Sequence, residues 1–99
     1  MGHKYKVEYV TPENLKLGQP LKQSIMGNFG LGECEWPTRI IRLNKTMSSD
    51  MVYTTLLHEI RHGFHFESGF TQVLNAQTLE IDADSFVSLA LSLKRQKII

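Results

Sequence analysis

The stretch TTLLHEIRHGFHF, residues 54–66, places two histidines four positions apart, with a glutamate directly after the first. Residues i and i+4 of an α-helix share one face and are separated by a rise of about 6 Å. His58 and His62 can therefore direct two imidazoles at one metal ion. Glu59 is rotated by about 100° around the helix, which suits a general base beside the metal. The stretch predicts a metal-binding helix. The alternative is three polar residues on a solvated surface.

The residues around this motif predict an amphipathic helix from Met51 to Phe66. Ser48, Ser49 and Asp50 are candidate N-caps, and Gly69 marks the end. One side carries Val52, Tyr53, Leu56, Leu57, Ile60, Gly63 and Phe64, and the other carries Thr54, Thr55, His58, Glu59, His62 and His65. We therefore expect the motif on the polar face of a helix whose apolar face packs against a core.

Length, charge and cysteine content restrict the class of protein. The chain has 99 residues, which predicts a single small domain over residues 1–99. Its formal net charge of +1, without a long run of one sign, argues against nucleic acid or an anionic membrane as the main partner. The sequence has no apolar stretch long enough to cross a bilayer and no signal-peptide core at its start, so we expect a cytoplasmic protein. Cys34 is the only cysteine, which excludes an internal disulfide.

The rest of the chain predicts an α+β fold. YKVEYV, residues 5–10, alternates as an edge strand does, and TPENLKLG, residues 11–18, reads as a short helical turn. Residues 21–44 predict an antiparallel β-meander, with strands in LKQSIMG, LGECE and TRIIRLN. A second helix is expected to begin between Thr71 and Thr78 and to run to about Lys94. Its apolar stripe consists of Leu79, Ala83, Phe86, Val87, Ala90 and Leu93.

A hydrolytic zinc site usually has three protein ligands, and Glu80 is the best candidate for the third. It follows His62 by 18 residues, enough for the chain to turn and return antiparallel. Glu80 also borders the apolar stripe, where an unpaired carboxylate would be costly. Cys34 and Glu67 are weaker candidates. His65 lies about 10 Å along the helix from His58, too far to share one ion, and we expect it near the rim of a cleft.

Two further acids lie close to Glu80. Asp84, one helical turn later, is expected to accept a hydrogen bond from the ring N–H of His58 or His62. Its alternative role is that of a solvated surface residue. Asp82 is expected to face solvent.

HEIRH, residues 58–62, followed by EIDADSF, residues 80–86, resembles the two motifs of the zinc metallopeptidases called gluzincins. Within them, the sequence is similar to the ImmA/IrrE-type peptidases and to small phage or prophage members described as minigluzincins. The resemblance implies a zincin-like domain in which His58, His62 and Glu80 bind Zn²⁺. An apolar strand precedes the motif helix in those families, as TRIIRLN does here.

Two functional hypotheses follow. The first is a zinc-dependent metallopeptidase with Glu59 as general base and a peptide or protein as substrate, bound as an extra strand along an edge strand at 38–44. Such an enzyme needs a group that stabilises the oxyanion, and His65, Tyr5 and Tyr9 are the candidates. The second is a zinc-stabilised protein-binding or regulatory module with little or no turnover. A related, weaker idea is an effector that binds a host protein.

Overall fold

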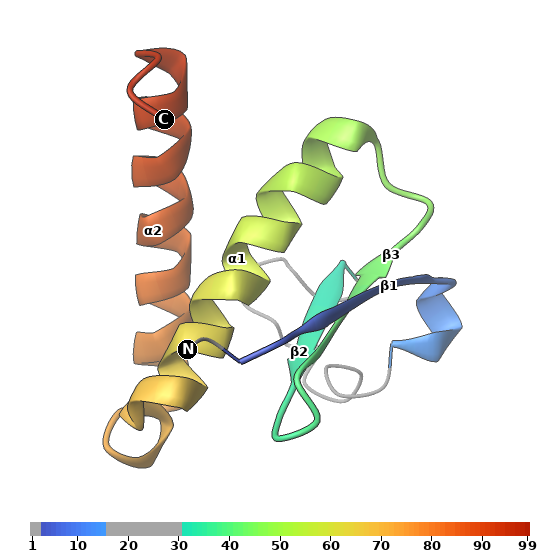
Figure 1. Ribbon diagram of the computed structural model, residues 1–99, viewed down its shortest axis with the longest axis vertical. Helices are drawn as coiled ribbons and strands as arrows, with labels where there is room; N and C mark the ends of the chain where they lie inside the picture. Colours follow the sequence, from blue (N-terminus) through green and yellow to red (C-terminus); the bar gives the residue numbers. More distant parts are fainter. Residues whose placement is uncertain (1–2, 16–30) are drawn as a thin grey trace.

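The computed structural model describes residues 3–15 and 31–99 and shows a small α+β domain (Figure 1). The strands are β1 (Lys6–Val10), β2 (Gly32–Glu35) and β3 (Ile40–Asn44), the long helices are α1 (Ser49–Ser68) and α2 (Ala76–Arg95), and η1 (Pro12–Asn14) and η3 (Phe70–Gln72) are short 3₁₀ helices. Helix α1 lies between the sheet on one side and α2 on the other (Figure 1). None of the described helices is both long and apolar enough to cross a membrane.

The described strands form a mixed sheet in the order β1-β3-β2, which corrects two predictions. β2 runs antiparallel to β3, but β1 runs parallel to it, so the described strands are not an antiparallel meander. The segment 38–44 contains β3, which is the central strand of the described sheet. The prediction that a substrate would bind along an edge strand at 38–44 was therefore wrong. β1 lies at an edge of the described sheet, as its alternation predicted. The expected strand in residues 21–27 lies outside the described residues.

Helix α1 begins and ends as its sequence predicts. The Ser48 hydroxyl accepts a hydrogen bond from the backbone N–H of Met51, and Gly69 closes the helix in the left-handed conformation with φ 83°. Burial does not follow the division into a polar and an apolar face, however. Thr55, His58, Glu59, Gly63 and His65 are buried, whereas Ile60 is 45% exposed. The physical reason is that α1 is covered on two sides.

The apolar core lies between α1 and the sheet. Its buried members are Cys34 on β2 and Ile41 and Leu43 on β3. Partly buried apolar residues pack around them: Tyr5, Met47, Val52, Leu56 and Phe66. Backbones approach closely here, because a Cβ on Gly32 would lie 2.7 Å from Thr55 Cγ2. β2 is thereby held directly against the helix that carries the histidines.

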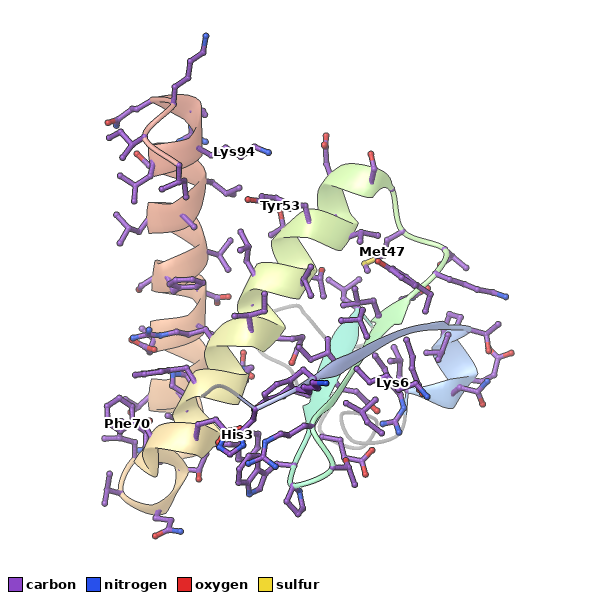
Figure 2. The ribbon with its side chains drawn as sticks, in the orientation of Figure 1. His3, Lys6, Met47, Tyr53, Phe70 and Lys94 are labelled. Carbon is purple, nitrogen blue, oxygen red and sulfur yellow. The ribbon has the colours of Figure 1, made fainter. Side chains whose placement is uncertain are left out.

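Helix α2 returns along α1 after the short helix η3. The side-chain oxygen of Asn75 caps its start by accepting from the N–H of Thr78. The predicted stripe is largely confirmed, since Leu79, Ala83, Val87 and Ala90 are buried. Toward the far end of the helix pair, Lys94 Nζ lies 4.5 Å from the centre of the Tyr53 ring (Figure 2). This antiparallel packing brings the first turns of α2 beside the histidines of α1.

Candidate metal centre

Three predicted ligands converge between α1 and α2. His62 Nε2 lies 3.1 Å from His58 Nε2 and 3.0 Å from Glu80 Oε2. His58 Nε2 lies 2.9 Å from Glu80 Oε1. The helical spacing aligns the two imidazoles, and the α1–α2 turn supplies the carboxylate. Among the described residues, this is the group of histidine, cysteine and acidic side chains that has the geometry to hold a metal ion.

The donor set fits a divalent metal ion such as Zn²⁺. Ligand atoms about 2.0–2.2 Å from a tetrahedral zinc lie about 3.3 Å from one another, so the observed spacings need only a small outward shift. Glu80 Oε1 is buried and accepts no hydrogen bond from the described residues, despite its closeness to His58. A cation at the centre of the group would satisfy this oxygen. Two imidazoles and one carboxylate are also a ligand set that catalytic zinc uses.

The charges of the group are consistent with this fit. Burial acts to raise the pKa of Glu80, but contacts with His58 and His62 outweigh it and lower the pKa to about 2. Burial acts to lower the pKa of His58, but Glu80, Glu59 and Asp84 outweigh it, so that its pKa is raised. Glu80 is therefore ionised at neutral pH and presents a negative charge to any cation between the rings.

Glu59 is buried beside the ligand group, with 5% of its surface exposed. Burial raises the pKa of its carboxyl to about 7, against the opposing effect of His62 and His58. Glu33 on β2 is another charge that acts on it. Charged groups on both the sheet and α1 therefore act on the pKa of Glu59. That pKa lies near neutral pH, which suits a general base working at neutral pH.

Asp84 lies where the sequence predicts it. Its Oδ1 is 3.0 Å from His58 Nδ1, the ring nitrogen that points away from Glu80. A carboxylate in this position accepts the Nδ1–H and fixes the ring so that Nε2 is free to bind a metal. Asp84 thus holds His58 rather than His62, a choice that the sequence left open.

His65 and Asp82 differ from their predictions. His65 is fully buried, not at a rim. Its Nε2 lies 2.6 Å from Asp82 Oδ2, and its Nδ1 lies 3.2 Å from His62 Nδ1. Asp82 also accepts a hydrogen bond from Arg61 Nε at 2.8 Å, so it joins the two helices instead of only facing solvent. The helical spacing could have predicted the contact between His62 and His65, because they are i and i+3 neighbours. Nothing in the sequence singled out Arg61.

The remaining candidates lie outside the ligand group. Cys34 belongs to the apolar core, and burial raises the pKa of its thiol to about 12. The Tyr5 hydroxyl donates to Glu67 Oε2 at 2.6 Å, and the same carboxylate pairs with Arg39. Tyr9 is 57% exposed on β1. None of these four predicted candidates, Cys34, Glu67, Tyr5 and Tyr9, joins the group of His58, His62 and Glu80.

Comparisons with protein-family models, with curated proteins and with solved structures give no match to this chain. The resemblance to gluzincins therefore stays at the level of the two short motifs.

Proposed function

We propose that this protein is a zinc-dependent metallopeptidase of the gluzincin type, with a zincin-like fold and with His58, His62 and Glu80 as the metal ligands. The observation that carries the proposal is the convergence of these three side chains, at separations of 2.9–3.1 Å, beside the buried carboxylate of Glu59. A purely structural metal site has no use for a second carboxylate buried beside its ligands.

A bound Zn²⁺ supplies Lewis acidity toward a water molecule and a peptide carbonyl. The protein side chains supply the rest. Glu59 takes a proton from the attacking water and passes it to the leaving amine, which its raised pKa permits near neutral pH. Asp84 holds the ring of His58 in place through Nδ1. The proposed substrate class is a peptide or a protein segment.

The second candidate is a zinc-stabilised protein-binding module of the same fold with little turnover. One observation favours it: the side chains considered for oxyanion stabilisation are committed or exposed. His65 is buried between His62 and Asp82, Tyr5 donates to Glu67, and Tyr9 is 57% exposed. This candidate retains the metal ligands and makes Glu59 dispensable.

Replacing Glu59 by Gln separates the two functions, because the amide keeps the size of the side chain and removes the base. Zinc content and peptide hydrolysis are measured on the purified parent and on Glu59→Gln, with a quenched-fluorescent peptide library as substrate. The peptidase predicts equal zinc in both and a loss of hydrolysis of about 10²–10⁴-fold in the variant. A zinc-loaded parent that cleaves none of the library would favour the binding module. A Glu59→Gln variant that hydrolyses peptides as fast as the parent would contradict the role of Glu59 as general base.

A further inference from the structure

The two motif histidines have different partners at the ring nitrogens that point away from the proposed metal. His58 Nδ1 lies 3.0 Å from a carboxylate oxygen of Asp84, whose side chain is 40% exposed. His62 Nδ1 lies 3.2 Å from another imidazole nitrogen, Nδ1 of the fully buried His65. A contact between two ring nitrogens needs one hydrogen between them, so the tautomers of the two rings are linked.

The hydrogen positions follow from the far end of this chain of contacts. His65 Nε2 lies 2.6 Å from Asp82 Oδ2, which also accepts a hydrogen bond from Arg61 Nε at 2.8 Å. An ionised carboxylate only accepts hydrogen bonds, so His65 carries its hydrogen on Nε2. With a metal ion on Nε2 of His62, that ring would carry its hydrogen on Nδ1, and His65 Nδ1 would be the acceptor. The hydrogen between the two rings consequently belongs to His62 Nδ1.

With its hydrogen on Nδ1, His62 has a lone pair on Nε2. That nitrogen is the one that faces His58 Nε2 at 3.1 Å and Glu80 Oε2 at 3.0 Å. A metal ligand must offer such a lone pair, and the opposite tautomer would place a hydrogen in the middle of the ligand group. In the metal-free chain, a hydrogen on Nε2 that faces Glu80 competes with this form. The contact with His65 therefore favours the form of His62 that is able to bind a metal.

We infer that His65 is a positioning residue, which holds His62 in its metal-binding tautomer and is itself held by Asp82. The inference rests on the proposed metal site. Packing supports it, since the centroid of the His65 ring lies 5.2 Å from that of the His62 ring and 6.3 Å from that of the Phe70 ring. A fully buried ring with aromatic neighbours and with partners at both nitrogens has little freedom to turn away.

Two amide substitutions separate this role from simple core filling. In His65→Asn the amide oxygen takes roughly the place of Nδ1, so an acceptor for His62 remains and the contact with Asp82 is lost. In His65→Gln the amide nitrogen takes roughly the place of Nε2, so the contact with Asp82 remains and the acceptor for His62 is lost. Both variants lose the ring, so a role in packing alone predicts similar effects from the two.

Two readouts are needed. Long-range ¹H–¹⁵N spectra of the metal-free proteins report which nitrogen of His62 carries the hydrogen. Competition with a chromophoric chelator reports zinc affinity, and circular dichroism melts verify folding. We expect His65→Gln to lose the Nδ1–H form of His62 and to bind zinc about 10–100-fold more weakly than the parent. His65→Asn should keep that tautomer and stay clearly closer to the parent in affinity.

Equal losses in the two variants, or an unchanged tautomer and affinity in His65→Gln, would overturn the inference while leaving the zinc site intact. A parent that binds no zinc would instead overturn the proposed function, and the metal-free spectra would still decide whether His65 sets the tautomer of His62. If both substitutions unfold the chain, Asp82→Ala replaces them, because the side chain of Asp82 is 39% exposed. It should lower the population of His62 with hydrogen on Nδ1, and an unchanged spectrum would contradict the inference.

Discussion

The two covered faces of α1 are built from opposite chemistry. Toward the sheet, the helix packs on Cys34, Ile41 and Leu43 through apolar contacts that have no required direction. Toward α2, its histidines and Arg61 meet acidic side chains at distances of 2.6–3.0 Å between named atoms. Substitutions that remove side-chain volume should weaken the face toward the sheet. On the face toward α2, the loss of a single donor or acceptor atom should be enough to weaken the contacts. Stability and metal binding should therefore respond to different substitutions.

The largest effect on stability is expected in the sheet-side core. Leu43 is fully buried on the central strand, and Leu43→Ala should lower the free energy of unfolding by about 2–5 kcal/mol. Urea denaturation measures it. Leu89→Ala is the control, because Leu89 is 59% exposed on α2 and should change stability by less than about 0.5 kcal/mol. A similar small effect from both would mean that the sheet-side contacts do not hold the fold.

Metal removal tests the other face. A metal that binds only the folded chain stabilises it by about 2.7 kcal/mol when its free concentration is 100 times the Kd. Thermal melts of the zinc-loaded protein with and without a chelator should therefore separate clearly. His62→Ala is the matched control, because it removes one ligand and its melts should not respond to the chelator. Superimposable curves for the zinc-loaded parent would contradict a metal-stabilised helix pair.

Asp84→Asn should have an intermediate effect on the same face. The substitution keeps the shape and removes the charge that faces His58 Nδ1 at 3.0 Å. Zinc affinity should fall by about 10–100-fold without being abolished. Asp50→Asn, at an exposed acid in the first turn of α1, serves as control and should leave the affinity unchanged. An affinity of Asp84→Asn equal to that of the parent would return Asp84 to the solvated surface.

The smallest effect concerns the surface contact that ties α1 to the N-terminal segment and to the β2–β3 turn. Hydrogen bonds from Arg39 and then Tyr5 lower the pKa of Glu67 from 4.5 to about 2. A lowered folded-state pKa gives stability that is present above pH 4.5 and is lost as the pH falls toward 2. Glu67→Gln should remove that part of the acid dependence of the melting temperature. If the melting temperatures of parent and variant change with pH in the same way, the contact contributes nothing to the acid dependence of stability.

Local patterns predicted the parts of the molecule that local chemistry determines. Capping and periodicity placed both helices to within a few residues, and the i, i+4 spacing with the return of α2 brought Glu80 to the histidines. The position of Asp84 beside a motif histidine also follows from one helical turn. These features depend on residues that are neighbours along a helix or across one short connection.

The errors arose where distant segments meet. Parallel pairing of β1 with β3 joins residues about 34 positions apart in the register, Lys6 opposite Ile40, and no local pattern encodes it. Periodicity showed which side chains share a face of α1, but it could not show that two elements cover that helix. His65 was therefore expected at a rim, although it is enclosed between His62 and Asp82.

The most direct test of the central claim is metal analysis of the purified protein beside a ligand variant. After loading with zinc and removal of excess metal, the parent should retain about one equivalent, and Glu80→Ala should retain much less. Glu59→Gln should match the parent, because Glu59 is proposed as the base and not as a ligand. A parent without stoichiometric zinc, or a Glu80→Ala variant that keeps all of it, would contradict the assignment of His58, His62 and Glu80 as the metal site.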